Sequence, residues 1–298
     1  EICAGHIKLL PCEYNYTPHG SITGESDDPL VIHYAGIKYW KHYSHYRIYA
    51  DLSWDELHAR HKTEHRVAGY IGTKNQYAMM TASAKSLLAN TRMDRIYFLT
   101  EDDEFPYELP ECITVMNVSE QKYFDPSGPN YHSTFSYMPM LRAAYPDMFP
   151  QYDILLSIDN DTIVEQDISG LFEIDMSNYY YAAALEARPG RKVQQPYFNT
   201  GVMLMNIEKM RNDGIDRKTI DLLNANHYLN DSQDALCETC TDHILMISPA
   251  YNACMFTAPT DHVIIRHFAG SHKPYMKQFA DLYDKPWDEI LGSAGEKQ

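Results

Sequence analysis

Long apolar runs are missing from this 298-residue sequence, and positive charge is scarce in it. No stretch approaches the roughly 20 apolar residues that a membrane-spanning helix needs. Lys and Arg number 25 against 41 Asp and Glu, which gives a formal net charge of −16. Nucleic-acid polymers and anionic membranes are bound through basic faces, so this balance argues against both as partners. A local basic pocket is still allowed.

Cysteine is also scarce, and the six present are too few for a disulfide scaffold of this size. Cys237 and Cys240 form a lone CxxC pair, without a second pair or a His pair at zinc-ligand spacing close by. We interpret them as structural or free thiols, with metal binding and redox chemistry as alternatives. The sequence begins at Glu1, without a methionine or a signal-peptide pattern, so we expect it to be an internal piece of a longer chain.

The middle of the chain alternates short apolar runs with segments of helical spacing. The runs predict strands at 66–71, 95–99, 113–118 and 153–158, and helices at 78–88 and 135–144, the second closed by Pro146 and Pro150. Continuous apolar runs are typical of strands covered on both faces. The order predicts an α/β fold with a mostly parallel central sheet flanked by helices. Ligands bind beyond the carboxyl ends of such strands, which directs attention to 72–75 and 159–161.

The segment 1–57 repeats landmarks of the C-terminal part of the chain. The landmarks recur in the same order and at a nearly constant offset: Asn15, His33 and Trp54 match Asn252, His267 and Trp287. Gly36 and Lys38 similarly match Gly270 and Lys273. A nearly constant offset predicts a tandem array of similar domains. We therefore expect a tail at 1–57, a linker at 58–65 and one complete domain at 66–298.

Two carboxylates, Asp159 and Asp161, follow the predicted strand at 153–158. Side chains two residues apart in extended backbone point to the same side. Two oxygen ligands on one edge can hold Mg²⁺ or Mn²⁺, which in turn can bridge substrate phosphates. Considered alone, the two residues fit a plain turn at the strand end equally well, because Asp is a common turn former.

Three further segments follow in order. Residues 197–206 form a turn entering an apolar strand, 230–236 open a helix, and 267–274 join a His, a Gly and a Lys. Together with Asp159-Asn160-Asp161, they resemble glycosyltransferase family 8, the retaining GT-A enzymes that use nucleotide-sugar donors. The resemblance covers about 66–287. It implies a GT-A fold and a metal-dependent hexosyltransferase that takes UDP-glucose or UDP-galactose and acts on a glycan, lipid-linked or protein acceptor.

The resemblance also implies which residues hold the metal and the donor diphosphate. Asp159, Asp161 and His267 match the ligands of a divalent cation, Mn²⁺ or Mg²⁺, and an imidazole favours transition metals over Ca²⁺. Gly270 and Lys273 match the segment that closes on the diphosphate. Glycine permits close backbone approach there, and lysine supplies a point charge.

The remaining motif positions match residues that contact the donor sugar and nucleoside. Gln233 matches a glutamine near the anomeric carbon, and Asp234 follows it, so both are candidate catalytic residues. The candidate donor-binding residues are Asn160, Asn199 and Thr200, together with Gly72, Thr73, Asn75 and Tyr77 in the turn after the first strand.

The sequence departs from the family pattern at two places. Relatives commonly have an acid in the nucleoside turn to meet the uracil, where this chain has Thr73-Lys74. Many relatives also place an Arg or Lys facing the donor at 137–141, where this chain has none and Arg142 is the nearest base. The base contact and the donor-facing cation are therefore left open.

Two other function classes compete with this interpretation. A sugar nucleotidyltransferase shares the architecture and the acidic metal site. It would be expected to carry a glycine-rich, basic loop after the first strand, and residues 72–75 contain too few glycines and basic residues for such a loop. A catalytically silent glycan- or protein-binding module would be favoured by loss of the metal ligands, which are all present. For the transferase, no carboxylate nucleophile is obvious, so we expect front-face attack by the acceptor. A covalent glycosyl adduct on Asp234 or Glu186 would contradict this.

The N-terminal copy is too short to bury a core of its own. It docks on the complete domain, stays partly mobile, or exchanges with the C-terminal tail in an oligomer. In the exchanged form His33 and Lys38 would replace His267 and Lys273. We expect His267 to act, because its copy is continuous with the predicted catalytic core. We also expect a cytoplasmic protein, with a peripheral position at a membrane face as the alternative.

Overall fold

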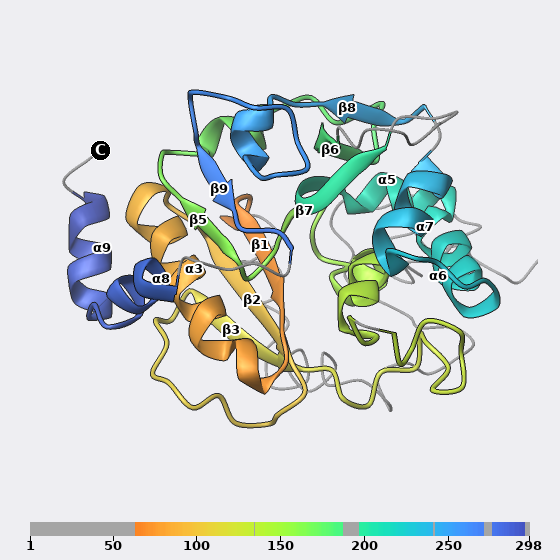
Figure 1. The fold of residues 1–298 in the computed structure, drawn as a ribbon, viewed down its shortest axis with the longest axis horizontal. Helices are drawn as coiled ribbons and strands as arrows, with labels where there is room; N and C mark the ends of the chain where they lie inside the picture. The colour runs from red at the N-terminus through yellow and green to blue at the C-terminus, as the bar shows by residue number, and fades with distance from the viewer. Residues whose placement is uncertain (1–62, 134, 187–196, 241, 271–275, 296–298) are drawn as a thin grey trace, which may run out of the picture.

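The computed structural model describes residues 63–133, 135–186, 197–240, 242–270 and 276–295 (Figure 1). The predicted tail at 1–57 lies outside the described residues, as do most of the predicted linker and Lys273, so the domain boundaries remain predictions. The described part is mixed α/β. It has a seven-stranded sheet in the order β3-β2-β1-β4-β7-β6-β8 and a two-stranded sheet, β5-β9.

The central sheet confirms the predicted strands and the mostly parallel architecture. β1 (Val67–Ile71), β2 (Arg95–Thr100), β3 (Ile113–Asn117) and β4 (Ile154–Ile158) all lie within one residue of their predicted bounds. The other strands are β6 (Tyr181–Leu185), β7 (Phe198–Asn206) and β8 (Ile244–Met246). Four of the six strand pairings are parallel, and β7 runs antiparallel to both β4 and β6.

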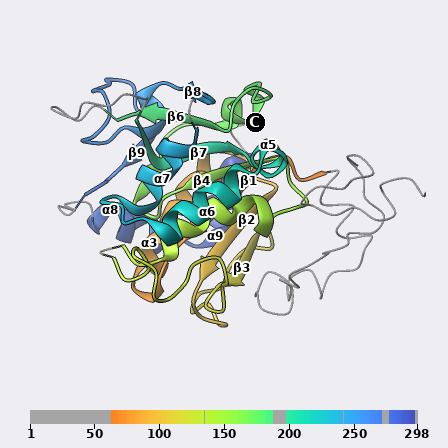
Figure 2. The ribbon, with the colours of Figure 1, turned by 90° about the vertical axis from the view of Figure 1, so that its right-hand side faces the viewer.

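Helices cover both faces of this sheet (Figures 1 and 2). One face carries α3 (Tyr77–Asn90), which follows the 3₁₀ turn η3 (Lys74–Gln76), together with α8 (Met276–Tyr283) and α9 (Trp287–Gly295). The other carries η4 (Met138–Ala144), α4 (Tyr145–Met148), α5 (Ile207–Asp213), α6 (Ile215–Ala225) and α7 (Asp231–Cys240). Short 3₁₀ helices, η5 (Ser169–Glu173) and η6 (Pro249–Asn252), lie in the connections. In the part of the chain described, no helix is both long and apolar enough to cross a membrane.

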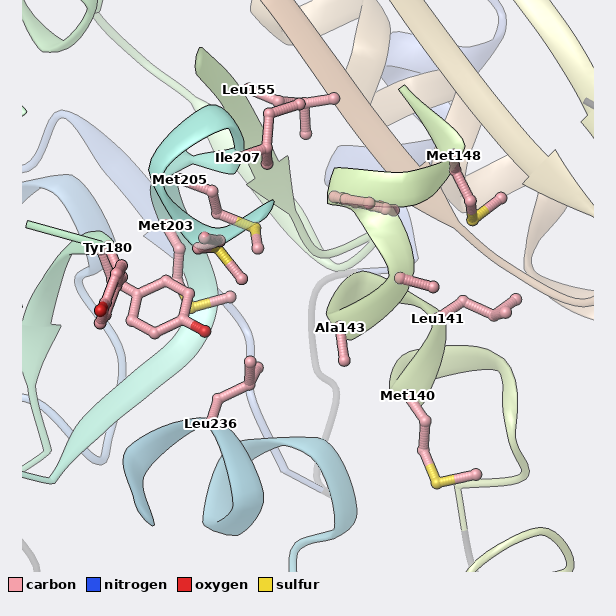
Figure 3. Packing of buried hydrophobic residues seen from close by; sticks show 14 of the residues in the cluster. Met140, Leu141, Ala143, Met148, Leu155, Tyr180, Met203, Met205, Ile207 and Leu236 are labelled. Atoms are coloured by element: carbon pink, nitrogen blue, oxygen red, sulfur yellow. The ribbon is translucent and has the colours of Figure 1, made fainter. Parts of the chain in front are cut away.

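The strands divide their side chains between two cores. In β7, Met203 and Met205 belong to the core under α4–α7, whereas Val202 and Leu204 belong to the core under α3. Figure 3 shows the first core, where Met203 and Met205 lie together with Leu236 of α7. Since successive residues of a strand point to opposite faces, a strand covered on both sides reads as one continuous apolar run. The sheet is therefore packed against a hydrophobic core on each face.

Two predicted boundaries differ from the structure. The helix expected at 135–144 begins at Met138 as a 3₁₀ helix and continues into α4 through Pro146, which was expected to close it. Proline is tolerated there because the first turn of a helix has no acceptor for its missing N–H. The turn expected at the start of 197–206 is already strand from Phe198 on, because Phe198 pairs with Leu185 of β6.

The CxxC pair is buried on α7, one helical turn apart. The thiol of Cys237 donates to the carbonyl of Phe198, at 3.6 Å, and that of Cys240 to the carbonyl of Cys237, at 3.4 Å. Burial raises the pKa of both thiols, to about 12 for Cys240. Both therefore stay protonated at neutral pH, which supports structural or free thiols over the metal-binding and redox alternatives.

Lys85, buried in the middle of α3, joins this helix to the C-terminal helices α8 and α9. Its Nζ donates to the carbonyls of Tyr283 and Lys285, both at 2.5 Å, and lies 5.0 Å from the centre of the Trp287 ring. Lys85→Met keeps the stem but leaves both carbonyls without this donor. We expect it to lower the free energy of unfolding by about 2–3 kcal/mol, measured by urea denaturation.

Lys209→Met is the matched control for this prediction. Lys209 forms an exposed pair with Asp213 one turn away, at 2.9 Å. We expect a loss below about 1 kcal/mol, because exposed pairs contribute little. Equal losses in the two variants would contradict the role given to Lys85.

Candidate active site

A small antiparallel sheet brings His267 beside the acidic pair. β5 (Thr162–Val164) directly follows Asp161 and pairs with β9 (Ile265–His267), so that Thr162 lies opposite His267. The N–H of Phe268 also donates to the carbonyl of Asp161, at 2.9 Å. This pairing joins segments that are distant in sequence. It lies beyond the carboxyl end of β4, where the sequence directed attention.

Three side chains converge at this point on ligand atoms that a cation can share. Nε2 of His267 lies 3.3 Å from Oδ1 of Asp161 and 3.6 Å from Oδ2 of Asp159. One ligand atom from each of the three residues lies within 4.8 Å of the others. The His267 side chain is 3% exposed, whereas that of Asp159 is 30% exposed, so the cluster opens on its carboxylate side. Two carboxylates and one imidazole can hold a divalent cation.

The cluster favours positive charge beside the carboxylates. Burial lowers the pKa of His267, but hydrogen bonds with Asp161 and Cys254 and the negative charges of Asp161 and Asp159 raise it to about 10. The carboxylates thus overcome the penalty of burying a charged ring. Either a proton on the imidazole or a bound cation places positive charge beside the two carboxylates.

Arg142, the base nearest to the position where relatives have a donor-facing cation, contacts the acidic pair. It is buried, its Nη2 lies 2.7 Å from Oδ1 of Asp159, and its Nη1 donates to the carbonyl of Thr200, at 2.9 Å. Its planar fork thereby fixes one carboxylate of the pair relative to β7. Arg142 lies on the 3₁₀ helix η4 and points inward. An α-helical repeat applied to the same residues could not have indicated this direction.

Gly201 of β7 was missed by the sequence analysis. A Cβ at this position would lie 2.1 Å from Cε1 of His267, and the Gly201 carbonyl accepts from the N–H of Asp159, at 2.8 Å. Only a residue without a side chain lets the imidazole pack against this strand. The sequence feature that could have indicated this role is a single glycine inside the nine-residue strand β7.

The candidate donor-sugar residues gather around Gln233 at the start of α7. Its Oε1 accepts from the N–H of Thr200, at 3.2 Å, and its Nε2 donates to Oε2 of Glu186, at 2.7 Å. The same carboxylate oxygen accepts from Nδ2 of Asn199, at 3.1 Å. All four side chains are buried. Because Arg142 bonds Thr200 as well as Asp159, this amide cluster is joined to the acidic pair.

Asp234 and Asn160 are held differently. Oδ1 of Asp234 accepts from the hydroxyl of Tyr197, at 2.6 Å, and Oδ2 accepts from the N–H of Asn230, at 2.9 Å, so this carboxylate secures the first turn of α7. Nδ2 of Asn160 donates to the carbonyl of Ile71, at 2.7 Å. That bond ties the loop between the two acids to the end of β1.

The predicted nucleoside turn follows β1 directly. Gly72 leaves room for Asn160, because a Cβ there would lie 2.7 Å from its Nδ2. The hydroxyl of Thr73 lies 2.6 Å from Oδ1 of Asn75, within the turn. Tyr77 is 1% exposed and its hydroxyl donates to Asp102, at 2.9 Å, so its ring belongs to the core.

Gly270 is the last described residue before the segment that contains Lys273. Its φ of +103° is a conformation that glycine adopts readily and other residues rarely do. Gly270 is exposed and lies three residues after His267 in the chain. Lys273 itself lies outside the described residues.

Comparisons with known proteins place the chain in a family. The profile described as Glycosyl transferase family 8 matches residues 71–278. General stress protein A of Bacillus subtilis is 27% identical over 165 residues, which are 45% of this chain and 57% of the relative. Glycosyltransferase GlyA of Streptococcus pneumoniae is 24% identical over 254 residues, 78% of this chain and 36% of the relative. The chain thus spans from about a third to just over half of these relatives.

Solved structures share the fold. The crystal structure of glycosyltransferase GlyE from Streptococcus pneumoniae aligns with a TM-score of 0.61 at 22% identity, over 78% of this chain and 63% of that one. Galactosyltransferase LgtC, in complex with donor and acceptor sugar analogs, aligns with a TM-score of 0.60 at 18% identity, over 76% of this chain and 99% of that one. The fold is therefore the predicted GT-A fold. With a family profile that matches well over half of its length, the chain belongs to glycosyl transferase family 8.

Proposed function

We propose that this chain is a metal-dependent, retaining glycosyltransferase that moves a hexose from a UDP-sugar to a glycan, lipid-linked or protein acceptor. The observation that carries the proposal is the convergence of Asp159, Asp161 and His267 beside the amide cluster of Gln233. Membership of the family supports it. The description of LgtC with donor and acceptor sugar analogs supports a sugar donor and a sugar acceptor.

The residues at the cluster fit a divalent cation, best Mn²⁺. The ligand atoms lie close together, one is an imidazole nitrogen, and Arg142 already offsets part of the charge on Asp159. When bound, such a cation supplies positive charge against the negative charge that grows on the leaving diphosphate. Arg142 holds Asp159 in place on the protein side. We further propose that Gly270 and Lys273 close on the diphosphate.

On the sugar side, the chain offers fixed amides. Gln233 is held at both ends of its amide, so it can meet the sugar with little reorganisation. The carboxylate of Glu186 accepts two hydrogen bonds, and that of Asp234 is engaged by Tyr197 and Asn230. Because both carboxylates already accept hydrogen bonds from neighbouring residues, the arrangement supports front-face attack by the acceptor over a covalent intermediate on Glu186 or Asp234.

We also keep the tandem arrangement as a proposal. Residues 1–57 would then be the tail of a preceding copy, and His267 rather than His33 would serve this site. Its support is that the matched region, 71–278, falls inside the proposed complete domain at 66–298. A cytoplasmic location, peripheral attachment and tail exchange are proposals of the same kind.

The test measures UDP release by the full chain from UDP-glucose and UDP-galactose. We expect release from one of them with Mn²⁺, loss of release with EDTA, and recovery when Mn²⁺ is restored. A product with inverted anomeric configuration, or a glycosyl adduct on Asp234 or Glu186 by mass spectrometry, would contradict the mechanism. Absence of release from every nucleotide sugar would favour the silent module, and pyrophosphate release would favour the nucleotidyltransferase.

A further inference from the structure

Asn252 lies directly behind the candidate metal ligand His267. It is fully buried at the end of η6, and its Oδ1 lies 2.8 Å from Nδ1 of His267. The Nε2 atom on the opposite side of the same ring faces Asp159 and Asp161. One ring nitrogen therefore faces the acidic pair, and the other faces an amide.

The hydrogen bonds around Asn252 determine which of its atoms faces the imidazole. The N–H of Gly201, which can only donate, lies 3.0 Å from one side-chain atom of Asn199, so that atom is Oδ1. Asn252 lies 2.9 Å from the same oxygen and must present its Nδ2 there. Its other atom, facing His267, is therefore the oxygen. An amide oxygen only accepts, so Nδ1 of His267 carries the proton.

We propose that Asn252 is a positioning residue that keeps a proton on Nδ1 of His267 and so directs Nε2 to the cation. The inference rests on the proposed function, since it concerns the same metal site. Ligating histidines generally donate their other N–H to a carboxylate or carbonyl oxygen, which fixes the ring and raises its basicity. Here a side-chain amide supplies that oxygen.

The same amide connects the ligand to the donor-sugar residues. Nδ2 of Asn252 fixes Asn199, and Nδ2 of Asn199 bonds the carboxylate of Glu186, which also holds Gln233. Asn252 therefore sets the orientation of one side chain at the cation and of another at the sugar. Both functions depend on the amide having an acceptor end and a donor end.

The sequence carries an independent sign of the pairing. In the N-terminal repeat, Asn15 matches Asn252 and His33 matches His267. The two residues thus recur together, in the same order and at a similar separation in both copies. This joint recurrence is consistent with a functional pair retained in both copies of the domain.

The test compares two near-isosteric substitutions by Mn²⁺ binding, measured by electron paramagnetic resonance on the full chain. Asn252→Leu removes the acceptor and is expected to weaken Mn²⁺ binding about 10- to 100-fold. Asn252→Asp keeps an acceptor for Nδ1–H and is expected to bind Mn²⁺ within about threefold of the parent. It loses the donor to Asn199, so its turnover should fall although the metal is bound.

Asn130→Leu is the matched control. Asn130 is also buried, and its amide donates to the carbonyls of Leu223 and Asn226 at the end of α6, a helix that contributes no residue to the metal cluster. It should lose thermal stability without losing Mn²⁺ affinity. Equal Mn²⁺ affinity in Asn252→Leu and the parent would overturn the inference. Failure of the parent to bind Mn²⁺ at all would instead overturn the proposed function.

A measurement on the unsubstituted chain covers the case in which Asn252→Leu does not fold. In the Zn²⁺-loaded protein labelled with ¹⁵N-histidine, His267 is identified by comparison with His267→Gln. We expect its Nδ1 to carry a proton that exchanges slowly with water, and its Nε2 to carry the metal. A metal on Nδ1, or a proton on Nε2, would overturn the inference.

Discussion

Replacing Asp161 with asparagine is expected to lower sugar transfer from the UDP-hexose donor about a hundred- to a thousand-fold. The amide keeps the size of the side chain but removes one of the two negative charges that face His267. The cation then binds more weakly and offsets less charge on the leaving diphosphate, an effect worth several kcal/mol. UDP release and Mn²⁺ binding, measured on the same preparation, should fall together.

Asp167→Asn is the control for this substitution. Asp167 is exposed and accepts hydrogen bonds from Thr91 and Ser169, beyond the end of β5. Its loss should affect the stability of that turn and leave Mn²⁺ affinity unchanged. If Asp161→Asn releases UDP at the parental rate with EDTA-sensitive kinetics, the ligand assignment is wrong. The cation would then be held elsewhere.

Gly201→Ala is expected to displace His267 from the cluster. The added Cβ would lie 2.1 Å from Cε1 and 2.5 Å from Nδ1 of the imidazole, which no real contact reaches. The ring must move away from β7 to relieve this contact, and such a movement strains the hydrogen bond of its Nδ1 to Asn252. We expect Mn²⁺ affinity to fall by at least about tenfold, and the free energy of unfolding to fall by about 1–3 kcal/mol.

Gly170→Ala separates the site effect from the general effect of substituting a glycine. A Cβ at Gly170 meets no atom within 4 Å, and the residue is exposed in η5. Neither stability nor Mn²⁺ affinity should change by more than a small amount. Unchanged Mn²⁺ affinity in Gly201→Ala would show that His267 can bind the metal without packing closely against Gly201 of β7.

The parts of the fold that could be predicted are those with long, uniform patterns. β1, β2 and β4 are buried on both faces, so each appears as an apolar run with clear ends. β5 and β9 have three residues each, too short for any periodicity, and they form only because the chain brings them together. Their pairing positions His267, so the resemblance could identify this residue but the pattern alone could not.

The residues that escaped prediction depend on contacts between separate elements. Arg142 lies on a 3₁₀ helix, whose three residues per turn place side chains differently from an α-helix. Its direction toward Asp159 therefore could not be taken from an α-helical phase. Gly201 and Asn252 act through His267, which belongs to a later strand of the chain. From the sequence alone, Gly201 is indistinguishable from an ordinary glycine in a strand, and Asn252 from an ordinary asparagine in a turn.

The most direct test of the central claim is a crystal structure of the full chain with Mn²⁺ and UDP, with the metal located by its anomalous signal. The account predicts one strong peak between the carboxylates of Asp159 and Asp161 and Nε2 of His267, with the diphosphate oxygens of UDP on its open side. A peak held by His33 in place of His267 would contradict the assignment of this copy as the catalytic one. UDP bound beside the acidic pair without a metal peak there would contradict metal dependence itself.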